Sequence, residues 1–319
     1  MHIADLQRAH LDAAERLALA DYDRQRAVSP ALPPMVATED LSPVFENNLG
    51  VAALDGDRLV GFLVCCGPFP HAFRSTDATG VWSPNHMNAA TTENRAAIYT
   101  RLYQASAEKW VRAGASSHGI GLYAWDRETQ AQFFRLGFGM RTADGIRGMD
   151  ALDAPSTAAF SFRRLAQNQF RLAFPLQQRL DAHMEKSPTF MRRPGETLEA
   201  FLESAAQPET RLYAAFQGSQ VAAFLKFERS GETFIQNQPD YIHVTGAYCM
   251  PAYRGAFVVQ NLLNCAIRDL KAAGYARLGV DFESINPAAH RFWQKHFDIY
   301  TAGLVRRIDE HALPKARAE

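Results

Sequence analysis

The stretch PAYRGAFVVQNLL occupies residues 251–263, between a strand-like run at residues 241–250 and a helix-like run at residues 258–273. The first amides of a helix have no acceptor within the helix, and the aligned peptide dipoles place partial positive charge at that end. A strand-to-helix junction of this kind can therefore bind an anion such as phosphate. Arg254 would add a permanent positive charge. The sequence thus predicts a local phosphate site.

The bulk composition limits the classes of partner. The length of 319 residues suits two domains. Lysine plus arginine and aspartate plus glutamate both total 34, so a net charge of zero gives no broad attraction to nucleic acid or to an anionic membrane. No apolar run is long enough to span a bilayer, and the N-terminus is too charged for a signal peptide. We therefore expect a cytoplasmic protein.

The cysteines indicate neither disulfides nor a metal site. Cys65, Cys66, Cys249 and Cys265 show no CxxC spacing, so we expect buried free thiols. His243 is close to Cys249 in sequence, but zinc would need further ligands at suitable spacing. No metal is expected.

The order of elements runs twice along the chain. The first half is expected to contain an amphipathic helix that includes Ile3 and Leu6, a hairpin that turns at residues 55–57, a strand at 80–83, a helix at 93–113, a strand at 119–125, a helix at 127–136 and a strand at 146–149. The second half is expected to contain a strand at 160–165, helices at 170–185 and 196–204, a hairpin at 212–227, strands at 241–250 and 276–280 around a helix at 258–273, a helix after Asn286, and a strand at 300–308. Two domains follow, at residues 1–152 and 153–319.

This order resembles the GNAT (N-acetyltransferase) fold, here in its tandem two-domain form. The match is strongest at residues 251–263, which resemble the pyrophosphate turn of the family, and at residues 278–297 (LGVDFESINPAAHRFWQKHF). In the first half, residues 122–139 resemble the same region. The resemblance implies an α/β fold (α+β mixed sheet) of two tandem GNAT-like domains, each a twisted mixed sheet flanked by helices.

The resemblance also implies acetyl-CoA as co-substrate, bound between splayed strands at residues 241–250 and 276–280. The thioester carbonyl would meet the amide of Cys249, and the pyrophosphate would meet the turn and the start of the helix. The pantetheine arm would lie beside Asn286 and an aromatic pair. The cofactor-binding residues implied by the resemblance are Cys249, Arg254, Gly255, Ala256, Phe257, Val258, Val259, Asn286, Phe292 and Trp293.

The chain departs from the family pattern in three places. The family turn reads Arg-x-x-Gly-x-Gly, and its two later glycines are Phe257 and Val259 here. A phenylalanine could crowd a phosphate or force a wider turn, because only glycine has no Cβ. In the first half, residues 83–88 (SPNHMN) have neither the arginine nor a glycine, so the CoA site of that domain is expected to be degenerate. The family's frequent tyrosine acid would fall on Phe133 in the first half and on Phe292 or Trp293 in the second.

Four residues are candidates for proton transfer. Asp281 and Glu283 lie two apart near a strand end and share a face, so they could hold an acceptor ammonium or act as base. His243 titrates in a useful range, and Tyr248 is the nearest hydroxyl that could replace the missing tyrosine. Each also has a structural interpretation, as a solvated strand end or a packed strand residue. Arg254 can equally be an exposed loop arginine and Asn286 a plain helix cap.

The resemblance therefore implies an acyltransferase of the class that transfers groups other than aminoacyl groups. It would be an acetyl-CoA-dependent N-acyltransferase, in which a small-molecule or peptide amine attacks the thioester directly. The alternative is a non-catalytic GNAT-fold protein that binds CoA or another ligand as a sensor or scaffold. A partner-binding module would instead present a large exposed apolar patch. The sequence indicates neither the acceptor nor the oligomeric state.

Overall fold

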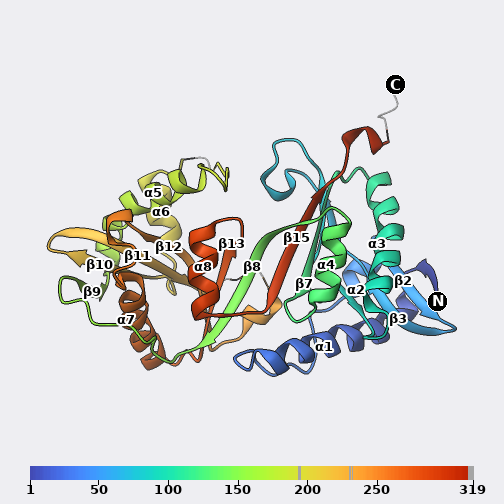
Figure 1. The fold of residues 1–319 in the computed structure, drawn as a ribbon, viewed down its shortest axis with the longest axis horizontal. Coiled ribbons are helices and arrows are strands. Elements are labelled where there is room, and N and C mark those ends of the chain that lie inside the picture. The colour runs from blue at the N-terminus through green and yellow to red at the C-terminus, as the bar shows by residue number, and fades with distance from the viewer. Residues whose placement is uncertain (193–194, 230, 232, 315–319) are drawn as a thin grey trace. The chain divides into compact units, whose positions relative to one another are not determined.

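The computed structural model describes residues 1–192, 195–229, 231 and 233–314. The chain divides into two compact units, one made of residues 1–143 and 299–319, the other of residues 144–298 (Figure 1). The last strand therefore packs with the first unit, whereas the sequence-based division placed it in the domain at 153–319. Among the described residues, no helix is long and apolar enough to cross a membrane.

The first unit contains two sheets. Its elements are β1 (His2–Asp5), α1 (Leu11–Val28), α2 (Ser42–Phe45), β2 (Val51–Asp55), β3 (Arg58–Leu63), β4 (Cys66–Phe69), β5 (Gly80–Ser83), β6 (Asn88–Ala90), α3 (Arg95–Arg112), β7 (Ser117–Tyr123), α4 (Arg127–Arg135), the first part of β8 (Gly139–Gly148) and β15 (Thr301–Arg307). One sheet has the antiparallel order β1-β2-β3-β6, and the other has the order β4-β5-β7-β15-β8, in which only β5 and β7 are parallel.

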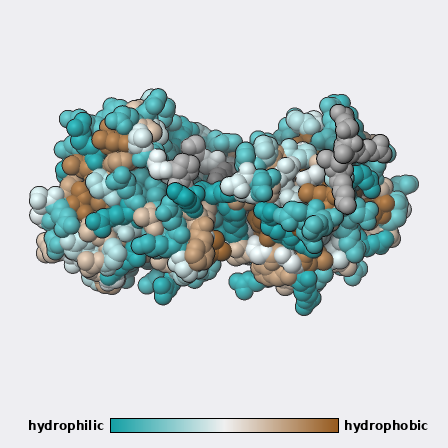
Figure 2. All heavy atoms as spheres, turned by 90° about the horizontal axis from the view of Figure 1, so that it is seen from above, coloured by the Kyte–Doolittle hydropathy of each residue, from teal (hydrophilic) through white to brown (hydrophobic). Residues whose placement is uncertain are grey.

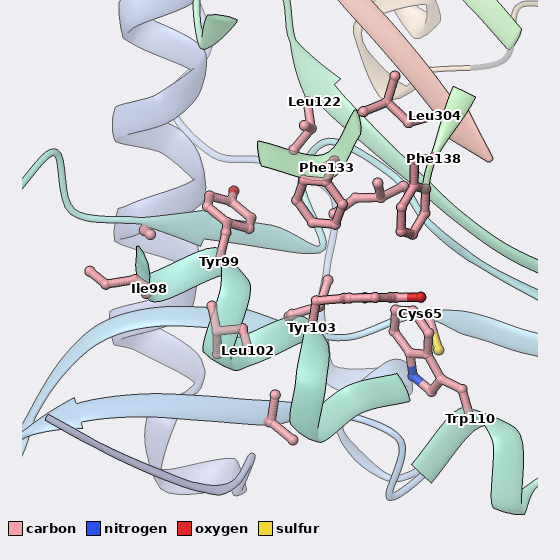
Figure 3. Close-up of a cluster of buried hydrophobic side chains, with 14 of the residues drawn as sticks. Cys65, Ile98, Tyr99, Leu102, Tyr103, Trp110, Leu122, Phe133, Phe138 and Leu304 are labelled. Carbon is pink, nitrogen blue, oxygen red and sulfur yellow. The ribbon is translucent and has the colours of Figure 1, made fainter. Parts of the chain in front are cut away.

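Alternation along β2 separates two hydrophobic cores. Val51 and Ala53 face the core under α3, whereas Ala52 faces the core under α1, because successive strand residues point to opposite faces. Figure 3 shows the first of these cores, where rings from α3 and α4 meet edge to face. Phe133 and Phe138 lie 5.0 Å apart between ring centroids. The two cores hold helices on both faces of the antiparallel sheet.

Two expectations for the first unit are wrong. Ile3 lies in β1, not in a helix, because residues 2–5 form an antiparallel ladder with β2. The turn that precedes the long helix is at residues 91–94, not at 83–88. Residues 84–87 instead interrupt one extended stretch, so that β5 pairs with β7 while β6 pairs with β3.

The second unit is one mixed sheet covered on both faces. Its elements are β9 (Ser161–Arg164), α5 (Phe174–Met184), α6 (Leu198–Ala205), β10 (Arg211–Gln217), β11 (Gln220–Glu228), β12 (Tyr241–Cys249), α7 (Val258–Ala272), β13 (Arg277–Glu283) and α8 (Pro287–His296). The strand order is β13-β12-β11-β10-β9, in which only β12 and β13 are parallel. In Figure 1, α5 and α6 lie above these strands and α7 lies below them.

The faces of the second sheet differ in what they bury. Leu212, Ala214 and Phe224 pack against α5 and α6 in one hydrophobic core. The alternate residues of β10 point to the other face, where α7 packs against β9, β10 and β11. On the molecular face shown in Figure 2, hydrophobic residues form small groups between hydrophilic ones.

Candidate functional site

The two parallel strands of the second unit separate partway along their length. Pairing of β12 with β13 begins at Tyr241 and ends where Val244 faces Val280. Beyond that point β12 continues to Cys249 and pairs only with β11 among the described strands. Its register with β11 shifts at Lys226/Phe227, so that Thr245 is an extra residue. Such a bulge bends the strand and increases its twist, which accounts for the separation.

The separated part of β12 presents backbone donors to the gap. The amide of Met250 donates to the carbonyl of Ala222 at 2.9 Å, and antiparallel ladders alternate between bonded and non-bonded pairs. The pair formed by Cys249 and Ala223 is therefore a non-bonded one. The N–H of Cys249 consequently points away from β11, into the gap between β12 and β13. This is the direction that the expected contact with a thioester carbonyl requires.

The turn after β12 directs its arginine back toward the strand. Nε of Arg254 donates to the carbonyl oxygen of Cys249 at 3.1 Å, and the guanidinium lies 5.5 Å from the ring centre of Tyr248. Arg254 is therefore not a free loop side chain. Gly255 has φ of 82°, and no atom lies within 4 Å of the position that a Cβ would take. Gly255 thus serves the left-handed backbone of the turn.

The amides of residues 255–260 are free of hydrogen bonds within the described chain. Residues 258–260 form the first turn of α7, where no acceptor exists inside the helix. Phe257 stands immediately before this helix with φ of 58°, a left-handed conformation that glycine adopts without cost. Its side chain is 39% exposed and does not line the neighbouring cavity. The turn therefore keeps a glycine-like backbone at Phe257, and no wider turn is needed.

Phe257→Gly should raise the free energy of unfolding by up to about 1 kcal/mol, because a left-handed non-glycine residue costs roughly 1–2 kcal/mol and glycine returns part of this as unfolded-state entropy. Val259→Gly, at the other position where the family has glycine, should lower it by up to about 1 kcal/mol, since Val259 is inside the helix. Urea unfolding of both variants measures this difference. Equal effects of the two substitutions would contradict the structural assignment.

Helix α8 begins at the gap. The side chain of Asn286 is buried and its Oδ1 accepts hydrogen bonds from the amides of Ala288 and Ala289 at 3.2 and 3.4 Å. Its Nδ2 lies 3.6 Å from Sδ of Met184. Asn286 is thus the predicted helix cap. The Phe292 ring lies 4.9 Å from the Trp293 ring.

These elements enclose a cavity of about 570 Å³. Its lining includes three permanent cations, Arg254, Arg291 and Lys295, and no aspartate or glutamate. His296 also lines it, and burial together with Lys295 and Arg147 lowers the pKa of its ring. The cavity is therefore a positive region in a chain whose net charge is zero.

The cavity includes most of the cofactor-binding residues expected from the sequence. Those in its lining are Cys249, Arg254, Gly255, Val258, Val259, Asn286, Phe292 and Trp293, whereas Ala256 and Phe257 are outside it. Tyr248 lines it as well, but His243, Asp281 and Glu283 do not.

His243 and Asp281 form a pair at the point where the strands separate. His243 is 1% exposed, and its Nε2 lies 2.5 Å from Oδ1 of Asp281. Its Nδ1 is buried and has no partner among the described residues. Asp281, one residue beyond the last paired position of β13, is 36% exposed at its side chain. Glu283 is two residues further along the same face of β13.

Sequence reasoning missed Arg291, Lys295 and His183 in the cavity lining. A signal for two of them existed: Arg291 and Lys295 are four residues apart on a helix and therefore share a face. Phe292, three residues before Lys295, adjoins this face. His183 comes from α5, and nothing in the local sequence of that helix indicates that it reaches the cavity.

Comparisons with known proteins agree with this geometry. Residues 178–298 match the model of the acetyltransferase (GNAT) family. No curated protein matches the chain in sequence. Among solved structures, a GCN5-related N-acetyltransferase from Sphaerobacter thermophilus has 12% identity and a TM-score of 0.53, with coverage of 99% of this chain and 96% of that one. An acetyltransferase from the GNAT family of Colwellia psychrerythraea has 11% identity, a TM-score of 0.47 and coverage of 97% and 100%.

A further structure, a tandem GNAT protein from the clavulanic acid biosynthesis pathway, has 13% identity, a TM-score of 0.43 and coverage of 99% of both chains. The predicted fold class of mixed sheets in two tandem GNAT-like domains is confirmed by the full-length match to the Sphaerobacter thermophilus structure. The family match therefore lies within the second unit, at residues 178–298, and the similarity of fold extends over nearly the whole chain.

Proposed function

We propose that the protein is an acetyl-CoA-dependent N-acyltransferase with its active site in the second unit and an amine as acceptor. The observation that carries the proposal is the cavity lined by Arg254, Arg291 and Lys295 without any carboxylate. It adjoins the free amides of residues 255–260, so fixed dipoles and side-chain charges favour the same polyanionic ligand. CoA carries a pyrophosphate and a further phosphate, and its extended arm fits a gap between separated strands.

The residues around the gap supply the chemistry of direct transfer. The Cys249 amide donates to the thioester carbonyl and stabilises the charge that develops on its oxygen. The Cys249 thiol is a poor nucleophile, because burial raises its pKa to about 11, so the amine itself attacks. The new C–N bond forms as the C–S bond breaks.

Two protons move in this reaction. Glu283 holds the incoming ammonium, and Asp281, held by His243, takes the proton that the ammonium loses before it attacks. The nitrogen loses a second proton as the amide forms, and this proton replaces the one that the leaving thiolate takes up. Tyr248, whose ring lines the cavity beside Arg254, donates the proton that the leaving thiolate gains. The positions where the family often has a tyrosine, Phe292 and Trp293, have no hydroxyl and only enclose the arm.

Arg254→Glu should weaken acetyl-CoA binding by about 30- to 150-fold, because a charged contact of about 2–3 kcal/mol is replaced by repulsion. Isothermal titration calorimetry measures this. Arg268→Glu is the matched control, since Arg268 is an exposed residue of α7 outside the cavity. Absence of saturable binding by the unaltered protein, or equal binding by both variants, would refute the proposal.

A non-catalytic CoA-binding protein is the second candidate, favoured by the missing hydroxyl at Phe292 and Trp293. The two candidates differ in turnover. Transfer of acetyl from acetyl-CoA to any member of a panel of primary amines, with loss of transfer in Glu283→Gln, would exclude the non-catalytic candidate. Binding without transfer across the panel would favour it.

A further inference from the structure

The first unit contains strand positions that correspond one by one to those around the gap of the second unit. Asn88 of β6 pairs with Leu63, and Ala247 of β12 pairs with Leu225. Each partner is the seventh residue after the glycine of its hairpin turn. Asn88 therefore stands where the second unit has Ala247.

The neighbouring strands correspond in the same way. Ile120 is the last residue of β7 that pairs with β5, and Val280 is the last residue of β13 that pairs with β12. Each precedes its helix cap, Asp126 or Asn286, by six residues. The first unit thus has the same separation of parallel strands and the same capped helix after it.

A polar side chain bridges this separation in the first unit. Nδ2 of Asn88 donates to the carbonyls of Pro84 and Gly121 at 2.9 and 3.1 Å, which joins β6 to β7 across the gap. Its Oδ1 accepts from the hydroxyl of Tyr99 at 2.9 Å. Asn88 is 2% exposed. The alanine at the corresponding position of the second unit leaves this space open to the cavity.

A buried arginine closes the region next to the bridge. Arg95 is the first residue of α3, as Val258 is of α7, and is 6% exposed. Its guanidinium binds the carboxylate of Asp126 and the carboxylate of Asp21, the latter at 2.5 Å between Nη2 and Oδ2. Asp21 belongs to α1 and is 1% exposed. Helix α1 is thereby bound to the helix cap and to the start of α3.

The turn before α3 also differs from the turn before α7. It consists of residues 91–94, and the second unit has residues 250–257 in its place. The residue before the helix is left-handed in both, with φ of 52° at Asn94 and 58° at Phe257. The shorter turn contains the acidic Glu93 and neither glycine nor a basic residue. A negative charge at this point opposes a phosphate.

The proton-transfer residues have no counterpart either. When Ile120 is aligned with Val280 and Ser83 with Val244, the positions of Asp281, Glu283 and His243 fall on three other residues of the first unit, named here in the same order. These residues are Gly121, Tyr123 and Trp82. The first unit therefore lacks a carboxylate or histidine at the place where the second unit has its candidate base.

We infer that the first unit carries a closed counterpart of the second unit's site, filled by Asn88, Arg95 and Asp21, and that the chain binds one acetyl-CoA. The network takes the space that the co-substrate has in the second unit, and an ion pair within the chain replaces the ligand. The inference rests on the proposed function for the open site, but the closure of the first unit can be tested without it.

Calorimetry and hydrogen–deuterium exchange with acetyl-CoA test the binding part on the full chain. We expect one site per chain, binding to that site weakened by about 30- to 150-fold in Arg254→Glu, and ligand-dependent protection of residues 247–260 but not of residues 88–99. Two sites, or protection at residues 88–99, would overturn the inference while the proposed function stood. Absence of protection in both segments would refute the proposed function, and the closure would then be decided by the next measurement.

Arg95→Leu tests the closure itself. It leaves Asp21 and Asp126 buried without their cation, so the melting temperature should fall by about 5–10 °C. Arg112→Leu, an exposed arginine on the same helix, should change it by less than about 2 °C. Asn88→Ala removes the bridge without a charge, and should speed amide exchange in residues 117–123. Unchanged stability in Arg95→Leu together with unchanged exchange in Asn88→Ala would overturn the inference.

Discussion

A chain that ends at Asp298 should lose the folded structure of its first unit, although 155 residues separate the deletion from Ala143, where the N-terminal part of that unit ends. The deletion removes β15, all seven residues of which pair with β7 from Thr301↔Tyr123 to Arg307↔Ser117. Every residue of β7 is buried. Without β15, the edge of this strand would lose its ladder and face water.

The hydrophobic core of the first unit would lose side chains at the same time. Ala302 and Leu304 belong to the core that contains Phe133 and Trp110, and Leu304 is fully buried. Loss of a buried leucine alone costs about 2–5 kcal/mol, and a domain has only about 5–15 kcal/mol of stability. The lost ladder adds to this. The expected result is therefore unfolding of the unit and not a small shift of stability.

Hydrogen–deuterium exchange resolved by segment is the measurement for this prediction. Residues 98–123 should exchange without protection in the chain that ends at Asp298. A chain that ends at Asp309 is the matched control, because it keeps β15 and removes only the terminal segment; it should retain full protection. Native protection of residues 98–123 in the shorter chain would show that β15 is dispensable.

The placement of β15 was also the part of the fold that the sequence could not indicate. Local sequence patterns predicted nearly all helices and strands. For example, the helix predicted at 258–273 is α7, and the strand predicted at 241–250 is β12. These depend on hydrophobic period and on turn residues, which are local. Which sheet a terminal strand joins depends on distant partners. A strand such as residues 301–307 could pair in the sheet of either unit, because both sheets have strands with the same pattern of buried residues.

The site shows the same division between local and distant information. Asn286 was predicted because a cap is defined by its own neighbours, and Arg254 because it stands before a helix. The bond between His243 and Asp281 joins two strands and has no signal in either one. Phe257 was interpreted as an obstacle to a bound phosphate only because of its residue type. In the structure its backbone has the left-handed conformation typical of glycine, and its side chain lies outside the cavity.

Asp281→Asn should reduce kcat for acetyl transfer by about 10²- to 10⁴-fold, the usual contribution of a positioned general base. The reason is geometric: Asp281 is the first residue of β13 beyond the segment that pairs with β12, its side chain is 36% exposed, and Nε2 of His243 lies 2.5 Å from its Oδ1. The amide has nearly the same shape but cannot take a proton. The measurement uses the best acceptor found in a panel of primary amines.

Two further readouts separate this role from a structural one. The affinity for acetyl-CoA should stay within about two-fold, because Asp281 does not line the cavity. The variant should also depend on amine that is already deprotonated in solution, so log(kcat/KM) for the amine should rise by about one per pH unit below the pKa of the amine. Asp298→Asn, an exposed aspartate, is the matched control. If Asp281→Asn kept full kcat with an unchanged pH profile, the base would have to be Glu283, which stands two residues further along the same face of β13.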